Sequence, residues 1–306
     1  MTTLPLLEKH NLTPKRPEFL DSSILGDFVR CPSYFYLRHV LGLVRKNRDP
    51  TATSSMDWGT CWHHCLEAYH RSGMDLEAGL RAIEENYPSH VRPDTDRYKR
   101  SKDRMIQGFF SYVERWKDLD EKMDFVRHEQ HFSVYLEDID LDWSGRIDSI
   151  RRQKGKVRPW DYKSTSSMGS SYFDQFELSF QFPGYVLASE KITGQRVREI
   201  TLDVFYTISR SQDFFRRTFS YTDADMREWK SNVSLWRDRL EYLLDNHLHE
   251  PEKWPKSWGQ CAWWYGRKCP FFEVHNISPI DDTRLLILEQ DFEERRWNPI
   301  AEESDT

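Results

Sequence analysis

The sequence predicts an α/β fold in which helices flank a mixed β-sheet. Residues 56–71 carry an apolar stripe at helical spacing. Residues 125–162 contain three successive strand-like runs, and the middle run alternates with a period of two. A helical segment and two further strand-like runs lie between residues 172 and 221. Helices before, between and after strands are typical of an α/β domain.

The composition is that of a globular chain with a polar surface. Of the 306 residues, 38% are apolar and 31% are charged, and 12 are tryptophans that can supply large core contacts. This length suits one large domain or two modest ones. The net charge of −6 gives no overall attraction to nucleic acid, although a local basic patch can still bind it.

Targeting and redox features favour the cytoplasm. No run of 18 apolar residues occurs, so we expect no membrane span. Residues 1–20 lack the apolar core of a secretory signal. The five cysteines are odd in number and unevenly spaced, which does not suit a disulfide framework. We therefore expect a reducing compartment.

Five helical segments are expected ahead of the strands. Ser22 is suited to cap the first, and Cys31-Pro32 interrupts the helical pattern before it resumes. Residues 42–55 lack periodicity and are predicted to be a linker. The helical ranges are 24–30, 34–40, 56–71, 76–85 and 96–118.

The strands are expected as a meander followed by a separate pair. Residues 151–156 are polar and end in Gly-Lys, which predicts a hairpin connection. From residue 251 the chain looks irregular, and the charged tail after residue 289 is expected to fray. Strands are predicted at 125–136, 141–149, 157–162, 197–208 and 214–221, and helices at 172–191 and 223–246.

Two acids and a lysine fall near the ends of two predicted strands. The first strand contains Gly-Arg-Ile-Asp148, and the second contains Asp161, Tyr162 and Lys163. Asp161 and Lys163 share a face because side chains alternate along a strand. Two carboxylates can hold Mg²⁺ or Mn²⁺. The lysine can orient an attacking water and offset charge on a phosphate, so the pattern predicts a divalent-metal phosphodiesterase.

Two residue pairs at a spacing of four could extend this site. His63 and Glu67 form either a helix-surface pair or, beside a carboxylate site, a set in which His63 is a further metal ligand. Gln181 and Tyr185 are either a surface and a core residue, or both face a nucleic-acid substrate. Pro183 between them leaves their relative direction open, because proline kinks a helix that it interrupts.

A basic group lies between the two acidic strand segments. Alone it indicates a solvated face, but its position beside the acids favours contact with phosphate. Its members are Arg151, Arg152, Lys154, Lys156 and Arg158.

Three cysteines and a histidine lie near predicted turns. Cys31 and Cys269 each precede a proline, Cys261 lies eight residues before Cys269, and His275 follows six residues after it. This spacing suits either ligation of a metal or ordinary buried thiols. Cys61 and Cys65, at helical spacing around the first histidine, are predicted to be packing residues.

Taken in order, these motifs resemble the PD-(D/E)xK nuclease superfamily. Within it the chain is most similar to the RecB-like exonuclease branch, which includes AddB nuclease domains, CRISPR-associated RecB-like nucleases and phage exonucleases. Each motif alone is weak, but the ordered set is specific. The matching segments are 23–42, 59–67, Glu129, 145–148, 161–163 and 181–185.

The resemblance implies a restriction-endonuclease-like fold with a mixed central sheet flanked by helices. It also implies a helical N-terminal section and an irregular, cysteine-bearing C-terminal section. The expected division is an N-terminal arm at 1–55, a nuclease core at 56–250 with a helical insertion near 74–120, and a cysteine-containing region at 251–306.

The resemblance further implies roles for the nuclease motifs. His63, Asp148 and Asp161 would ligate Mg²⁺ or Mn²⁺ together with the Tyr162 carbonyl. Lys163 would position and polarise the water. Two further residues would contact the DNA strand, namely Gln181 and Tyr185.

A second metal is implied for the cysteines. In this branch four cysteines often hold a [4Fe–4S] cluster, and Cys31, Cys261 and Cys269 match three of them. His275 stands where the fourth is expected, which leaves zinc or no metal as alternatives. Such a site would join the two ends of the chain.

The function expected from these features is a metal-dependent DNA exonuclease acting on single strands or duplex ends. Recombination or repair in a prokaryotic or phage-infected cytoplasm is the expected setting. The alternatives are a structure-specific endonuclease on the same core and a non-catalytic DNA-binding partner of a helicase or recombinase. The sequence has no Walker-type phosphate loop, so any motor would be another chain. Cleavage polarity, strand preference and oligomeric state do not follow from the sequence.

Overall fold

The computed structural model describes residues 12–46, 55–87, 100–208, 211–259, 261, 268–276 and 282–296. The chain divides into two compact units. The first draws on residues 1–47, 135–144 and 227–306, and the second on residues 48–134 and 145–226. Each is described by itself below.

The second unit holds most of a five-stranded sheet in the order β2-β3-β4-β5-β6, whose residues 135–136 and 141–144 are counted with the first unit. Strands β3 and β4 are antiparallel, β4 and β5 are parallel, and β5 and β6 are antiparallel. This mixed sheet confirms the predicted fold class. The strands are β2 (Asp124–Leu136), β3 (Leu141–Gln153), β4 (Lys156–Thr165), β5 (Glu199–Ile208) and β6 (Ser211–Ser220).

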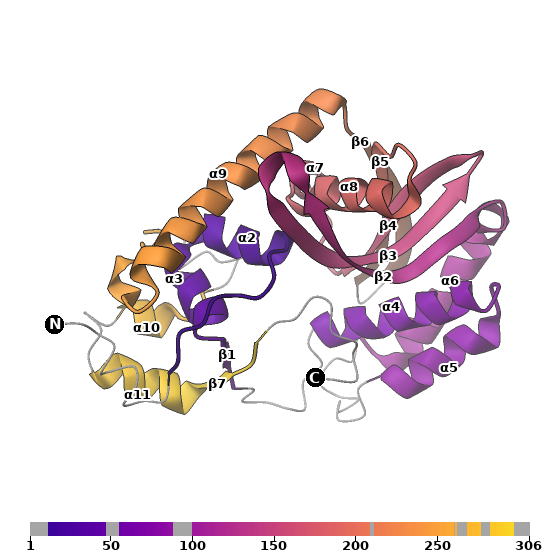
Figure 1. The fold of residues 1–306 in the computed structure, drawn as a ribbon. Coiled ribbons are helices and arrows are strands. Elements are labelled where there is room, and N and C mark those ends of the chain that lie inside the picture. The colour runs from indigo at the N-terminus through magenta and orange to yellow at the C-terminus, as the bar shows by residue number, and fades with distance from the viewer. Residues whose placement is uncertain are drawn as a thin grey trace. The chain divides into compact units, whose positions relative to one another are not determined.

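Helices cover both sides of this sheet (Figure 1). On one side lie α4 (Ser55–Arg71), α5 (Leu76–Asn86) and α6 (Lys102–Asp120), and on the other lies α8 (Gln181–Thr193). The predicted stripe of α4 is confirmed, because Trp58 and Trp62 pack at 5.1 and 4.6 Å from the ring of Phe205 on β5. Helix α6 begins later than predicted, since the Ser101 side chain caps it by accepting from the Arg104 N–H.

The β3–β4 hairpin turns more tightly than the sequence suggested. Its two turn residues, Lys154 and Gly155, have φ values of 50° and 78°. Positive φ at both central positions suits a two-residue turn whose twist matches that of the strands. The strands therefore extend through most of the predicted connection, and Arg151 lies within β3.

The helix predicted at 172–191 is interrupted. The structure has a short helix α7 (Asp174–Glu177), a break at residues 178–180, and then α8. Pro183 is the third residue of α8, where a backbone N–H has no intrahelical acceptor, so proline removes no helical hydrogen bond. Gln181 and Tyr185 therefore share one helix, without a kink between them.

The first unit is a helical assembly with a small two-stranded sheet. Phe28, Phe35 and Trp254 form its aromatic centre, in which Phe35 and Trp254 stack at 5.7 Å. Its elements include α2 (Ser22–Arg30), α3 (Pro32–Phe35), a π-helical turn (Tyr36–Val40), β1 (Leu43–Arg45), most of α9 (Asp223–His247), α10 (Phe272–Asn276), α11 (Asp282–Asp291) and β7 (Phe292–Glu294).

Three expectations for this unit are corrected. The cap of α2 is Asp21, whose carboxylate accepts from the N–H groups of Ser23 and Ile24, and Ser22 is the first helical residue. The predicted linker contains β1, and the charged tail contains β7. These two strands pair antiparallel, which satisfies their backbone groups. Residues 47–54 and 297–306 lie outside the described residues.

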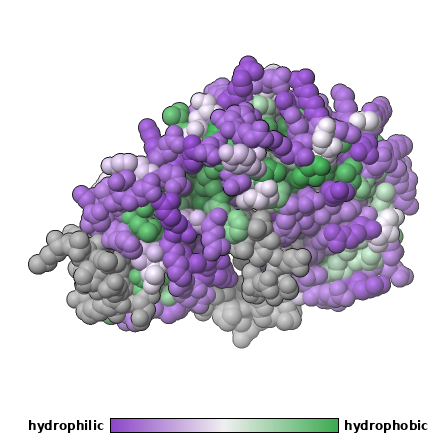
Figure 2. Space-filling model, in the orientation of Figure 1, coloured by the Kyte–Doolittle hydropathy of each residue, from purple (hydrophilic) through white to green (hydrophobic). Residues whose placement is uncertain are grey.

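The described surface is mainly hydrophilic on the face drawn in Figure 2. None of the described helices is long and apolar enough to cross a membrane.

Candidate metal centre

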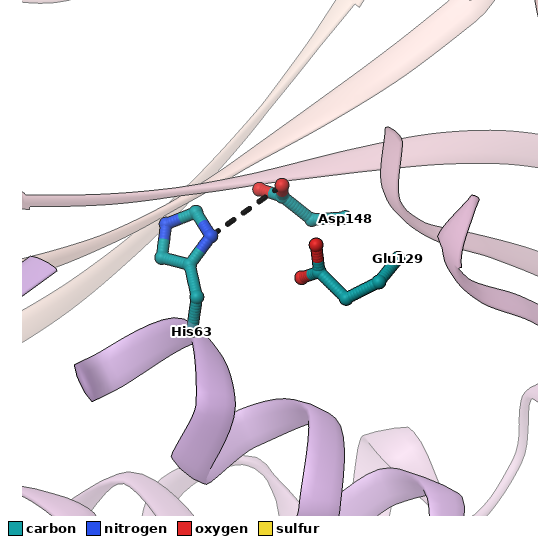
Figure 3. Close-up of side chains that lie close together, drawn as sticks. All are labelled: His63, Glu129 and Asp148. Carbon is teal, nitrogen blue, oxygen red and sulfur yellow. Dashed lines mark ion pairs between the residues drawn. The ribbon is translucent and has the colours of Figure 1, made fainter. Parts of the chain in front are cut away.

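Three potential metal ligands from three elements meet in the second unit. They are His63 on α4, Glu129 on β2 and Asp148 on β3, and one ligand atom of each lies within 4.8 Å of the others. Figure 3 shows the imidazole reaching from the helix toward the two carboxylates on the strands. In the sequence His63 lies 66 residues from Glu129 and 85 residues from Asp148 (129 minus 63, and 148 minus 63). The packing of α4 against the sheet brings the three residues together.

The backbone turns Glu129 into this site at a conformational cost. Its φ is 41°, within the left-handed region that side-chain-bearing residues rarely adopt. Such outliers inside a strand tend to mark functional positions. The Arg146 Nε lies 3.1 Å from Glu129 Oε2, yet neither carboxylate oxygen of Glu129 has a hydrogen bond of good geometry among the described residues.

The pKa values of the two carboxyl groups are shifted in opposite directions, that of Glu129 upward and that of Asp148 downward. Burial, followed by the charge of Asp148, raises the pKa of Glu129 to about 8. Burial also acts to raise the pKa of Asp148, but His63, Lys163 and the Tyr162 N–H outweigh it, and the pKa is lowered. Burial would lower the pKa of His63, yet the carboxylates of Asp148 and Glu129 raise it to about 9.

The next strand, β4, supplies the remaining predicted residues. Lys163 Nζ contacts both oxygens of Asp161, at 2.7 and 2.6 Å. Burial raises the pKa of Asp161 to about 6 against the opposing effect of Lys163. Between them, the Tyr162 N–H donates to Asp148 Oδ2 at 2.6 Å, and the Tyr162 carbonyl lies 2.9 Å from His63 Nε2. The two strand segments thus meet at one place.

The donor set fits a hard divalent cation. It combines carboxylate oxygens, a backbone carbonyl and one imidazole, the ligands that Mg²⁺ and Mn²⁺ accept. The buried oxygens of Glu129 have no good donor, and a cation would satisfy them.

The structure therefore gathers most of the predicted residues and adds one. His63 and Asp148 belong to the compact group, and Asp161 and Lys163 form an ion pair beside it on β4. Glu129 was matched as a motif residue but was not predicted to be a ligand. A signal was present, since it is an acid inside a strand next to the Asp148 strand, but its left-handed backbone could not be inferred from sequence.

Gln181 and Tyr185 lie against each other on α8. The Gln181 Nε2 donates to the Tyr185 hydroxyl at 2.9 Å. The Tyr185 side chain is 8% exposed, and its ring meets Phe132 of β2 edge to face at 6.0 Å. The packing makes Gln181 the more accessible of the two.

One member of the predicted basic group behaves differently from a surface residue. Arg151 is 1% exposed and its Nη1 bonds Asp120 at 3.3 Å. It points into the core, because it belongs to β3 rather than to a turn, and so it cannot contact a phosphate on the surface. Lys154 and Lys156 are exposed at the hairpin end.

The cysteine and histidine group lies in the first unit. Cys261 Sγ is 3.5 Å from His275 Nδ1, and the Cys269 N–H donates to the Cys261 carbonyl at 2.7 Å. Burial, together with the neighbouring thiols of Cys261 and Cys31, raises the pKa of Cys269 to about 12. The four donors thus converge, although among the described residues they do not form a group as compact as the carboxylate centre. All five cysteines are free thiols.

Comparisons with known proteins place the chain in a family. A family profile described as the PD-(D/E)XK nuclease superfamily matches residues 22–274. No curated protein matches the chain. Among the solved structures that match is one titled "Crystal structure of SSO0001". It is 11% identical, covers 79% of this chain and 89% of its own, and has a TM-score of 0.30. That likeness is too distant to support an argument. The family match spans most of the chain and includes every element of the carboxylate centre, so this protein belongs to the PD-(D/E)XK nuclease superfamily.

Proposed function

We propose that this protein is a divalent-metal-dependent DNA exonuclease of the RecB-like branch that acts on single strands or duplex ends. The observation that carries the proposal is the convergence of His63, Glu129 and Asp148 beside the Asp161–Lys163 pair. Nuclease chemistry needs a cation site and a positioned cationic side chain at one phosphodiester, and this arrangement offers both.

Each residue has a distinct task in this proposal. Asp148, Asp161, His63 and the Tyr162 carbonyl hold Mg²⁺ or Mn²⁺, and Glu129 completes the acidic wall. A bound divalent cation supplies Lewis-acid stabilisation of the charge that builds on the phosphate. Lys163 Nζ orients the attacking water and donates to the phosphate oxygens. The ammonium has three N–H donors, so it can do so while it contacts Asp161.

Gln181 and Tyr185 are proposed to serve the DNA strand. Gln181 is placed to hydrogen-bond a phosphate or a base edge. Tyr185 fixes the direction of the Gln181 amide through its hydroxyl. Both assignments are testable by substitution, because loss of either group should raise KM for DNA more than it lowers kcat.

The main experiment uses purified protein with labelled single-stranded, duplex and covalently closed circular DNA in Mn²⁺ or Mg²⁺. We expect cleavage of substrates with free ends, none in EDTA, and a reduction of kcat by about 10²–10³-fold in Lys163→Ala. Lys117→Ala, at an exposed position on α6, is the matched control and should retain activity. Full activity in Lys163→Ala would overturn the mechanism.

The same assay separates the alternatives. Digestion of the closed circle would favour a structure-specific endonuclease on this core. Tight DNA binding without cleavage in any divalent metal would favour a non-catalytic partner of a helicase or recombinase. The proposed biological setting is recombination or repair, in a phage or in a cell, and it rests on the resemblance.

We also propose a second metal group, a [4Fe–4S] cluster, at Cys31, Cys261, Cys269 and His275. The supporting observation is that three thiols and an imidazole from distant parts of the chain converge in one unit. The donor chemistry fits iron–sulfur or zinc. Ser33 Oγ lies 3.1 Å from His275 Nε2, so Nδ1 is the nitrogen that faces the thiols.

Metal analysis and the visible spectrum of anaerobically purified protein test this second proposal. A broad brown absorption band with iron and sulfide supports the cluster. Stoichiometric zinc, or no metal, would overturn it in favour of the corresponding alternative. Cys269→Ser should lose the metal, while Cys65→Ser, a buried cysteine in the other unit, should retain it.

A further inference from the structure

A buried network of charges lies on the face of β4 opposite Asp161 and Lys163. Arg216 donates from Nη1 and Nη2 to the two oxygens of Asp120 at 2.6 and 2.9 Å, and from Nε to Asp203 at 2.9 Å. Arg151 donates from Nη1 to Asp120 at 3.3 Å. The network joins α6, β3, β5 and β6. Four elements are therefore held to one another by charged hydrogen bonds.

Aromatic rings enclose both guanidinium groups. The Arg151 Cζ lies 3.9 Å from the ring centre of Trp160 and 4.5 Å from that of Phe125, and the Arg216 Cζ lies 4.2 Å from that of Trp116. Burying ion pairs costs desolvation energy, and apolar residues of the same volume often give equal or greater stability. Stability alone is therefore a weak reason for this network.

One side chain connects this network to the carboxylate centre. Arg151 Nη2 donates to the hydroxyl of Tyr162, which stands between Asp161 and Lys163 on β4. The backbone of Tyr162 contacts the other side of the site, because its N–H donates to Asp148 and its carbonyl lies within hydrogen-bond distance of His63. A displacement of Tyr162 would therefore move the backbone groups that contact Asp148 and His63.

We propose that Tyr162 is a positioning residue whose phenol, anchored by Arg151, fixes the backbone groups that orient His63 and Asp148. The anchor acts through hydrogen bonds on both sides of one residue and requires no contact between the phenol and a substrate. This inference deepens the proposed function, and only its activity readout rests on it.

The test compares Tyr162→Phe with Tyr112→Phe. Tyr112 is a matched control, because its hydroxyl also belongs to the network: it donates to Asp203 at 3.0 Å and accepts from Arg216 at 2.9 Å, but it comes from α6. Both variants remove one buried hydroxyl, and both should lower Tm. Only Tyr162→Phe should move the ¹H–¹⁵N imidazole resonances of His63 in metal-free protein.

Metal and activity readouts follow from the same geometry. We expect Tyr162→Phe to weaken Mn²⁺ binding, measured by calorimetry, by about 10-fold or more, as for a group that supports a ligand from behind. The Mn²⁺ concentration for half-maximal cleavage should rise by the same factor, and Tyr112→Phe should change neither. Arg151→Lys, which retains the charge, is a second variant should Tyr162→Phe fold poorly, and it should reproduce the His63 shift.

Unchanged His63 resonances and Mn²⁺ affinity in Tyr162→Phe, or equal changes in both tyrosine variants, would overturn the inference. A wild-type protein that fails to cleave DNA would overturn the nuclease proposal instead. The His63 resonances of the metal-free variants would still decide the role of Tyr162.

Discussion

The two faces of strand β4 differ in whether the buried polar groups beside them have hydrogen-bond partners. On one side, Asp161 and Lys163 face a centre in which both carboxylate oxygens of Glu129 are buried without a good hydrogen-bond donor. On the other, Tyr162 meets a network in which Arg151 and its partners are connected by direct hydrogen bonds.

The difference separates a site for a ligand from a structural device. A buried polar group that lacks its partner costs free energy, and a protein retains it where a ligand supplies the partner. A connected network rigidifies its surroundings and needs no ligand. Substitutions on the first side should therefore affect activity most. Those on the second side should affect stability most, apart from the Arg151–Tyr162 contact that joins the network to the site.

Glu129→Gln tests the carboxylate side and should have the largest effect on function among the variants that test this comparison. It removes a charge from the wall of the metal centre while it keeps the side chain's size. We expect cleavage to fall by about 10–100-fold, as for the loss of a residue that tunes a metal site. In metal-free protein above pH 8, where Glu129 is ionised, Tm should stay the same or rise, since Glu129 and Asp148 no longer repel each other. A large fall in Tm with retained activity would reverse the comparison.

Asp120→Asn tests the network side. Asp120 accepts from both Arg151 and Arg216, so its loss leaves two buried guanidinium groups with one fewer carboxylate. Removing one partner of a buried ion pair typically costs about 3–5 kcal/mol. Thermal unfolding should show a Tm lower by about 6–20 °C. The Asp238→Asn variant, at an exposed position on α9, is the control and should unfold like the wild type.

The sequence anticipated local patterns better than interactions across the fold. The strand alternation around Asp148 and the spacing of Asp161 and Lys163 predicted the core of the site, because side-chain direction along a strand follows from periodicity. The pairing of β1 with β7 depends on tertiary contacts that no local pattern encodes.

The same limit explains Arg151, whose environment was predicted wrongly, and Glu129, which was matched to a motif but not predicted to be a ligand. Arg151 sits in a polar run that is typical of a turn, and only the cage of Trp160 and Phe125 makes its burial possible. Glu129 is turned toward His63 by a left-handed backbone that strand periodicity does not predict. Both positions are set by partners far away in the sequence.

Adding Mn²⁺ should stabilise the wild type by linkage between binding and folding. At a free concentration 100 times Kd, a ligand that binds only the folded state adds about 2.7 kcal/mol to the free energy of unfolding. Differential scanning calorimetry should show this as a rise in Tm that Asp148→Asn abolishes. Because the network side needs no ion, Asp120→Asn should still gain from Mn²⁺ once its lower starting Tm is allowed for.

The smallest effect concerns pH and His70, which lies beside the network. Burial, followed by the charges of Arg151 and Arg216, holds the pKa of His70 well below its ordinary value of 6.5. Its ring stacks on Phe125 at 4.4 Å. As the pH falls below about 6.5, His70 is protonated in the unfolded chain but not in the folded chain. The contribution of neutral, buried His70 to the free energy of unfolding is therefore fully present above that pH. It is lost as the pH falls below it, by at most about 1.4 kcal/mol per pH unit.

Urea unfolding of wild type and His70→Phe between pH 8 and pH 5 measures this difference. Phenylalanine retains an aromatic ring against Phe125 but cannot be protonated, so the wild type should lose more stability than the variant below pH about 6.5. Parallel curves over that range would mean that His70 is protonated in the folded state. The network would then have to accommodate a third buried cation beside Arg151 and Arg216, and its two aspartates would no longer balance its charge.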